Sequence, residues 1–402
     1  MSFSRRRFLQ SSLVAGGLIS LEPVLPGFLC HAAEAAQSGN ILVVIQLTGG
    51  NDGLNTVIPY RHDAYRKARP TLAQSADSVL KINQVLGLHP VLNGFASLLE
   101  AGQLAIVQGV GYPDPNRSHF ESMDIWHSCR RKQEARPEGW LGKMLSALPV
   151  AALAGTPALH LGGEKQPLAL ASQKVAVPTI RDLQQFRLDI ARDEQLASLR
   201  RDAEQAQGAG ELLDFIQSTE KSALQVSRQL ERRKDYQPST PYPDYPLGEK
   251  LRTVAQLIHS GLETRIYYVE LDGFDTHSQQ APAHAGLLRQ LGDSVHAFVQ
   301  DLAEQKSLDR VTVLCFSEFG RRVAENASEG TDHGTAAPVF VCGSQIQSGV
   351  IGKLPSLDDL DAGDLKFHTD FRQVYAAVLK QWLKVPDQDI LGKSYEPVRL
   401  FS

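Results

Sequence analysis

The chain has 402 residues, with 41 Lys and Arg side chains against 45 Asp and Glu side chains, so its formal net charge is −4. Nucleic-acid binders usually carry an excess of clustered basic charge, which this balance does not suggest, and no nucleic-acid partner is expected. Hydrophobic residues make up 42% and charged residues 21% of the chain. These values exclude a disordered or fibrous protein and predict a globular core.

The cysteines give little support for a covalent or metal framework. There are four of them, and no two have the CxxC spacing. Such a sparse set favours neither a disulfide scaffold nor a cysteine zinc site. At most one disulfide is expected.

The first 35 residues are predicted to be an export signal. Three arginines at 5–7 precede a mostly apolar run over 8–21, which prolines and an alanine-rich stretch over 32–36 follow. The segment Ser-Arg-Arg-x-Phe-Leu resembles a twin-arginine signal, which the Tat translocase reads as an address. The resemblance implies a periplasmic or secreted protein that meets the Tat translocase during export and keeps no stable membrane span after cleavage. The alternative is an ordinary basic N-terminus before a buried helix.

Five apolar runs in the remaining chain are predicted to be buried strands. They cover 41–45, 104–107, 266–271, 311–316 and 339–342. Helical patterns alternate with these runs over 92–100, 248–258, 287–302 and 371–383.

This alternation predicts βαβ units and an α/β fold, with a largely parallel central sheet sandwiched by helices. We expect one domain over 36–402. The charged range 195–235 has an approximate apolar stripe and is predicted to be a peripheral helical excursion. In a sheet of this kind, functional groups belong at the carboxyl ends of the strands.

Two candidate site residues lie near the first two strands. Asp52 lies in the turn TGGNDG, where it is a turn residue or a metal ligand with equal weight. Ser118 and Glu121 have the spacing of a capping box that opens a helix. Ser118 is therefore either a plain N-cap or a nucleophile placed where a helix N-terminus stabilises an anion.

Later strands are followed by acidic and imidazole side chains. Asp275 and His277 follow the third strand, and Glu318 follows the fourth. Asp332 and His333 lie between glycines shortly before the fifth strand. Carboxylate and imidazole together suit zinc or manganese, or a hydrogen-bonded acid/base pair, and three such clusters at strand ends favour one shared site.

The motifs LTGGNDGLNT, NRSHFESMDIW, GFDTH, FSEFGR and GTDHG, together with the Tat signal, resemble an exported bacterial family known as domain of unknown function 1501. The order of these motifs is also similar to that of the alkaline phosphatase and sulfatase superfamily. The resemblance implies an alkaline-phosphatase-like fold with a divalent metal site of one or two zinc or manganese ions. It also implies a nucleophile at a helix start, a role that Ser118 matches.

By the same resemblance, Asp52, Asp275 and His277 match metal-binding positions of the superfamily. Two alignments compete for the rest of the motifs. In one, Asp332, His333 and Gly334 form the superfamily's Asp-His-Gly metal motif. In the other, which we favour, FSEFG takes that place, so that Glu318 stands for the aspartate and Phe319 for the histidine. His333 then belongs to a later metal-binding segment.

These assignments predict a metal-dependent hydrolase of small anionic esters in the cell envelope. Ser118 would attack, and Arg117 or Arg321 would neutralise the anion. Phosphate esters are favoured over sulfate esters because the Cys/Ser-x-Pro-x-Arg segment of sulfatases is absent. The alternative is a catalytically reduced protein that binds an envelope polymer or a partner protein, which the Phe319 position favours. Three further histidines are interpreted as structural or surface residues, namely His119, His127 and His160.

Overall fold

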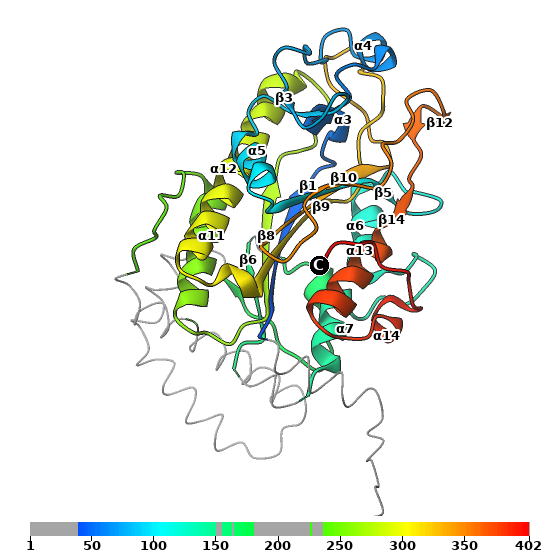
Figure 1. Cartoon of the computed structure of the whole chain (residues 1–402). Coiled ribbons are helices and arrows are strands. Elements are labelled where there is room, and N and C mark those ends of the chain that lie inside the picture. The colour runs from blue at the N-terminus through cyan, green and yellow to red at the C-terminus, as the bar shows by residue number, and fades with distance from the viewer. Residues whose placement is uncertain (1–38, 150–154, 163–164, 181–225, 227–235, 402) are drawn as a thin grey trace, which may run out of the picture.

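The computed structural model describes residues 39–149, 155–162, 165–180, 226 and 236–401. A large sheet forms the centre of the described part (Figure 1). Its strands are β1 Ile41–Thr48, β5 Leu104–Gly111, β6 Ala158–Leu161, β7 Thr179–Ile180, β8 Ile266–Asp272, β9 Val311–Ser317, β10 Ala337–Cys342, β11 Gly349–Ile351 and β14 Thr369–Asp370. The order across the sheet is β11-β5-β10-β9-β1-β8-β6-β7, and β14 pairs with β5.

The sheet is largely parallel, as predicted. β1 lies in its middle, parallel to both β8 and β9, with Val44 opposite Tyr268 on one side and Leu314 on the other. The first seven residues of β1 are buried, which explains its continuous apolar sequence. All five predicted strands are present.

β10 is the exception in direction, because it runs antiparallel to both of its neighbours. Phe340 lies opposite Cys315 of β9 and Ile106 of β5. As a result, the beginning of β10 reaches the edge of the sheet where its parallel neighbours end. The segment that precedes β10 therefore joins the loops that follow β1, β8 and β9.

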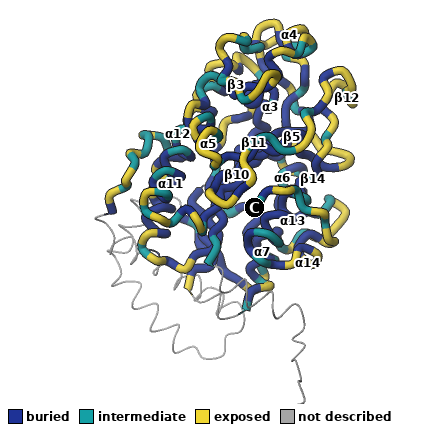
Figure 2. Tube along the Cα trace, in the orientation of Figure 1, coloured by how far each residue is buried: buried dark blue, intermediate teal, exposed yellow. Residues whose placement is uncertain are grey.

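Helices cover both faces of the sheet (Figures 1 and 2). One face packs against α5 Asn93–Glu100, α11 Pro246–His259 and α12 Gln280–Glu304. The other face packs against α6 His119–Ser128, α7 Trp140–Ala147, α13 Phe371–Ala377, a π-helical segment Val378–Trp382, and α14 Gln388–Leu391. The buried strands of the sheet lie between these two layers, which confirms the predicted α/β sandwich.

The helix predictions are confirmed with some changes in length. The predicted helix over 287–302 is part of α12, which begins earlier, at Gln280. The predicted helix over 371–383 is α13 with its π-helical continuation, and a capping box between Asp370 and Gln373 starts it. α7 and β6 were not predicted. The predicted excursion over 195–235, except Val226, and the predicted signal over 1–35 lie outside the described residues.

Short elements cover the carboxyl ends of the strands at the top of Figure 1. They include α3 Gly53–Thr56, α4 Asp63–Ala68, a small sheet of β2 Val57–Ile58, β4 Gly87–Leu88 and β3 Leu80–Lys81, and the hairpin of β12 Leu360–Asp361 and β13 Asp364–Leu365. Two 3-10 turns, Leu168–Leu170 and Leu308–Arg310, lie elsewhere. Leu54, Ile58, Tyr65 and Leu365 form part of a separate apolar cluster within this cover.

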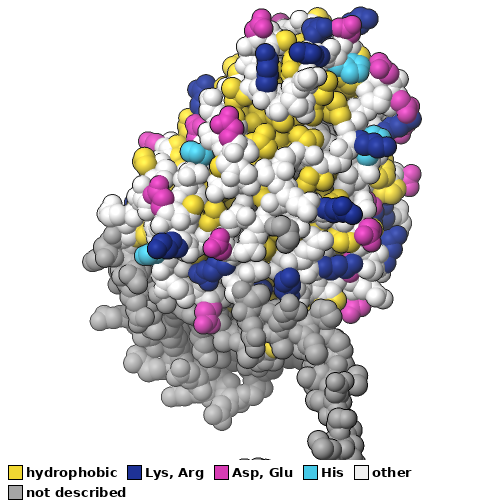
Figure 3. Space-filling view, in the orientation of Figure 1, with side chains coloured by type: hydrophobic (Ala, Val, Ile, Leu, Met, Phe, Trp, Pro, Cys, Tyr) yellow, Lys and Arg dark blue, Asp and Glu magenta, His cyan; other side chains and the backbone are white. Residues whose placement is uncertain are grey.

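The visible surface carries charges of both signs. On the face in Figure 3, Lys and Arg side chains are interspersed with Asp and Glu side chains. Within the described residues, no helix has the length and apolar character needed to cross a bilayer.

Candidate metal centre

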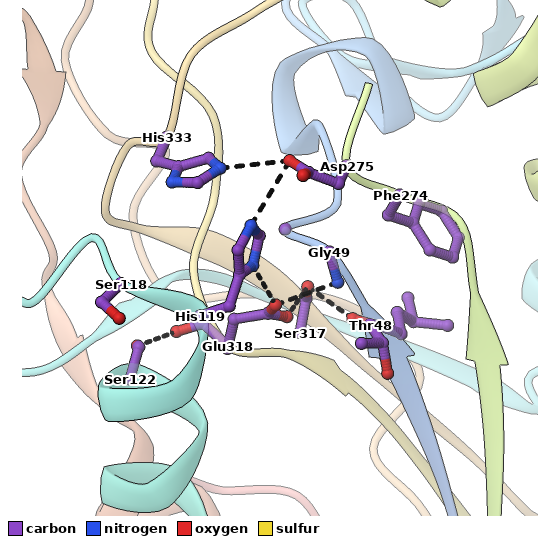
Figure 4. A network of polar contacts seen from close by, with 12 residues as sticks. Thr48, Gly49, Ser118, His119, Ser122, Phe274, Asp275, Ser317, Glu318 and His333 are labelled. Carbon is purple, nitrogen blue, oxygen red and sulfur yellow. Dashed lines mark hydrogen bonds and ion pairs between the residues drawn. The ribbon is translucent and has the colours of Figure 1, made fainter. Parts of the chain in front are cut away.

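The loops at the carboxyl edge of the sheet bring four chain segments together (Figure 4). Asp275 and His277 follow β8, Glu318 follows β9, and His119 begins α6. His333 comes from the segment before β10, which reaches this edge because β10 is antiparallel. Residues separated by more than 200 positions in the sequence therefore share one site.

One carboxylate oxygen, Oδ1 of Asp275, is the centre of this cluster. The Nε2 atoms of three imidazoles lie close to it, at 3.0 Å for His277, 3.1 Å for His333 and 3.4 Å for His119. Arg321 Nη2 donates to the same oxygen at 2.7 Å. Burial alone would raise the pKa of Asp275, but hydrogen bonds from Arg321 and His333 outweigh it and lower the pKa to about 2.

The other ring nitrogen of each histidine is also held. In all three rings Nδ1 faces an oxygen that can only accept, so Nδ1 can keep its proton while Nε2 serves as the lone-pair donor to a bound cation. The pairs are His119 with Glu318 Oε1 (2.8 Å), His333 with the Arg117 carbonyl (2.8 Å) and His277 with Asp332 Oδ1 (3.3 Å). Metal-binding histidines are oriented in this way.

The donor set fits a divalent metal ion. Nε2 of His119 is buried and has no hydrogen-bond partner, although it faces Asp275. Within the described residues, His119, Asp275 and His333 are the group whose ligand atoms all lie within 4.8 Å of one another. His277 Nε2 lies 2.9 Å from His333 Nε2 and extends this group. Imidazole nitrogens with one carboxylate oxygen are a ligand set that zinc accepts.

His119 is the member that sequence reasoning missed, since it was interpreted as a structural or surface residue. The available signal was its position next to Ser118, at the helix start that follows β5. Its hydrogen bond to Glu318 raises the pKa of the His119 imidazole, an effect that burial partly opposes. His127 and His160, interpreted in the same way, are both buried.

Glu318 and Asp332 lie behind the histidines. The Glu318 side chain is buried, with Oε1 accepting the Gly49 N–H at 2.9 Å and Oε2 accepting the Ser317 hydroxyl at 3.0 Å. Asp332 Oδ1 accepts from Asn326 at 3.1 Å as well as from His277. Both carboxylates, predicted as metal ligands, are placed to orient imidazoles.

Asp52 is close in the fold but is not part of this group. Its side chain is fully buried, and Oδ2 accepts from Arg69 Nη1 at 2.6 Å and from Gln280 Nε2 at 2.5 Å. Burial would raise the pKa of Asp52, but the charge and hydrogen bond of Arg69 outweigh it and the pKa is lowered. The structure therefore gives this carboxylate an arginine partner that the sequence did not reveal.

Ser118 is the N-cap residue of α6, as predicted, but the capping box does not form. The Ser118 side chain makes no cap hydrogen bond, and its backbone N–H donates to Asn116 Oδ1 at 2.8 Å. Glu121 instead pairs with Arg136 at 2.5 Å. In Figure 4 Ser118 lies beside the start of α6, next to His119 in the chain. Its exposed hydroxyl is not held by the helix end.

The two candidate anion-binding arginines have partners within the protein. Arg117 pairs with the buried carboxylate of Asp364, which Arg322 Nε also approaches at 3.3 Å. Arg321 is buried, and its donors reach the carbonyls of Gly49, Gly50, Phe274 and Thr331. Neither guanidinium is free of protein partners.

Phe319 packs against the imidazoles. Its ring is buried and lies 5.0 Å from the His119 ring and 4.8 Å from the His333 ring, measured between centroids. The residue therefore occupies a supporting position beside two of the clustered histidines.

The chain belongs to the family described as Protein of unknown function (DUF1501), whose model matches residues 94–390. A comparison with curated proteins found no match. Similar solved structures include the PsFucS1 sulfatase from Pseudoalteromonas sp., at 12% identity and a TM-score of 0.37, with 92% of this chain and 72% of that chain covered.

Two further solved structures are similar at the same level. One is a protein in the alkaline phosphatase superfamily from Vibrio parahaemolyticus, at 6% identity and a TM-score of 0.37, covering 89% of this chain and 70% of that chain. The other is the C-terminal periplasmic domain of EcEptC from Escherichia coli in complex with Zn, at 10% identity and a TM-score of 0.35. The match covers 77% of this chain and 74% of that chain.

Proposed function

We propose that this protein is a metal-dependent hydrolase of phosphate esters in the cell envelope. The observation that carries the proposal is the convergence of three imidazole Nε2 atoms on Asp275 Oδ1, each ring held by an acceptor at Nδ1. His119, His277, His333 and Asp275 would hold a zinc or manganese ion. Such an ion, when bound, acts as a Lewis acid toward the oxygens of an ester.

The charges around the centre favour an anionic substrate. At the rim, Arg117 and Arg322 share a single carboxylate, that of Asp364, so this group carries one net positive charge. The Arg117 and Arg322 side chains are 43% and 35% exposed. A phosphate group is attracted to such a rim. Sulfate esters are a less favoured substrate because the sulfatase segment is missing from the sequence.

Ser118 is the proposed nucleophile. It lies at the N-terminus of α6, where unpaired backbone N–H groups favour an anion. Attack of its oxygen on phosphorus would form a phosphoserine and release the alcohol, which takes up the hydroxyl proton. Water would then release phosphate and restore Ser118.

Replacement of the nucleophile tests the proposal. Ser118→Ala should reduce hydrolysis of an activated aryl phosphate by at least about 1000-fold and leave the metal content unchanged. Ser97→Ala, an exposed position on α5, is the matched control and should leave both quantities unchanged. Full activity of the Ser118 variant would refute this role, and a chain that binds no metal would refute the proposed class of enzyme.

Phe319 favours one alternative. An aromatic side chain stands beside His119 and His333 at the position where the superfamily resemblance places a ligand. In this alternative the protein is a catalytically reduced relative that binds an envelope polymer or a partner protein. Metal binding without turnover of any phosphate or sulfate ester would support it. For either function we propose export through the Tat translocase, with the signal over 1–35 removed.

A further inference from the structure

Arg321 places a permanent positive charge directly against the proposed metal ligand Asp275. Its side chain is fully buried, and Nη2 lies 2.7 Å from Asp275 Oδ1. Nε donates to the Gly50 carbonyl at 2.8 Å and Nη1 donates to the Thr331 carbonyl at 2.7 Å. These contacts hold the guanidinium in place, so it is a fixed part of the centre.

A second arginine occupies the carboxylate of Asp52, the residue that resembles a ligand of a second ion. Oδ2 of Asp52 is taken by Arg69 and Gln280. Oδ1 is buried without a hydrogen bond, but one oxygen is not a metal site. No other group of three His, Cys, Asp or Glu ligands around Asp52 meets within 4.8 Å in the described part of the chain.

The charges of the cluster also favour a single bound ion. Its carboxylates are Asp275, Glu318 and Asp332, and its guanidinium group is Arg321, while the Asp52–Arg69 pair beside it is neutral. With neutral imidazoles, these groups leave two negative charges. One divalent ion neutralises them, whereas a second would leave an excess of positive charge beside the buried guanidinium of Arg321.

We infer that the centre binds a single divalent ion and that Arg321 supplies a fixed positive charge in place of a second ion. The inference rests on the proposed function, because it assumes that the His119, His277, His333 and Asp275 cluster holds metal. It sets this centre apart from a two-ion site in which two metals share the substrate group. The guanidinium offsets the charge of Asp275 from inside the protein, while the Asp275 carboxylate and the imidazoles together hold the ion.

The metal content of the exported protein tests the inference. The protein is stripped with a chelator, loaded with excess Zn²⁺, dialysed and analysed for zinc per chain. A parallel sample is loaded with Mn²⁺ for electron paramagnetic resonance. We expect one equivalent of zinc and the six-line spectrum of an isolated Mn²⁺ ion. Two equivalents, or an exchange-coupled manganese spectrum, would overturn the inference and leave the proposed function standing. No bound metal would overturn both.

Two variants distinguish the residues involved. His119→Ala should weaken Zn²⁺ binding by at least about 100-fold. Loss of a metal ligand lowers the metal affinity more than loss of a residue that only orients a ligand. Asp52→Asn should leave both the zinc equivalents and the Zn²⁺ affinity unchanged. If Asp52→Asn weakens zinc binding as much as His119→Ala does, Asp52 is a ligand and the inference is wrong. The wild-type measurement decides alone if Asp52→Asn does not fold.

Discussion

His119 connects the outer imidazole cluster to a buried carboxylate. Its Nδ1 meets Glu318 Oε1, while Gly49 N–H and the Ser317 hydroxyl also hold the Glu318 side chain. Glu318 therefore cannot turn away without breaking several hydrogen bonds. The direction of the His119 lone pair is thus set by two strand ends, those of β1 and β9, that lie next to each other in the sheet.

Glu318→Gln tests this orienting role. The amide keeps the shape of the side chain but removes the charge that supports the imidazole, so Zn²⁺ affinity should fall by about 10–100-fold. Competition with a chromophoric chelator measures this affinity. Glu304→Gln, an exposed change at the far end of α12, is the control. Equal zinc affinities for the two variants would show that Glu318 does not orient His119.

Among the individual site residues, the sequence predicts those that lie next to buried strands. It misses those whose role depends on how distant segments pack together. Asp275, His277 and His333 stand out because acidic and imidazole side chains follow or precede buried runs. His119 lacks a spaced partner in the sequence, so nothing local distinguishes it from a structural histidine. The pairing of Asp52 with Arg69 depends on the path of the chain through α4, which no motif describes. The catalytic role of Ser118 stays a prediction.

The turn after β1 controls how closely the loops approach each other. Gly49 has a φ of +116°, and a Cβ there would lie 2.4 Å from the Asp275 backbone nitrogen. Only a residue without a side chain can therefore occupy the position. The TGGNDG turn serves the site mainly by this close approach, whereas its aspartate is buried in an ion pair.

Gly49→Ala and Gly102→Ala separate strain from close contact. Gly102 also has a positive φ, of +74°, but a Cβ added there would have no atom within 4 Å. Gly102→Ala should lower the free energy of unfolding by about 1–2 kcal/mol from backbone strain alone. Gly49→Ala should lose a further ~1–3 kcal/mol through overpacking. Urea unfolding measures both, and equal losses would contradict the close approach.

The strands were predictable because those buried on both faces have continuous apolar sequences. The direction of β10 was not predictable, because an apolar run reads the same in either direction. β6 has only four residues, which is too few for a periodic pattern to be recognised. The helix ends shifted for a related reason, since α12 begins with Gln280 and other residues that show no apolar pattern.

Buried histidines link the stability of the whole molecule to pH. Burial lowers the pKa of His89 and of His284 to about 4, and that of His127 to about 3. In the unfolded chain these groups have a pKa near 6.5. Below that pH the unfolded state takes up protons that the native state refuses, so stability is lost as the pH falls.

We therefore expect the free energy of unfolding of the chelator-treated protein to decrease between about pH 6.5 and pH 4. Each buried histidine contributes about 1.4 kcal/mol per pH unit in this range. His119 opposes the trend, because its raised pKa favours the protonated native state at low pH. Urea unfolding at several pH values measures the slope. A stability that stays flat from pH 6.5 to pH 4.5 would contradict the buried neutral histidines.

The reversed direction of β10 has a consequence for assembly. His333 precedes this strand, whereas His119 and Asp275 follow β5 and β8, so the ligand atoms meet only after distant parts of the chain have paired. A nascent polypeptide that has not yet reached β10 lacks His333 and cannot complete the proposed ligand set. The full set of proposed ligands therefore exists only once the sheet is complete.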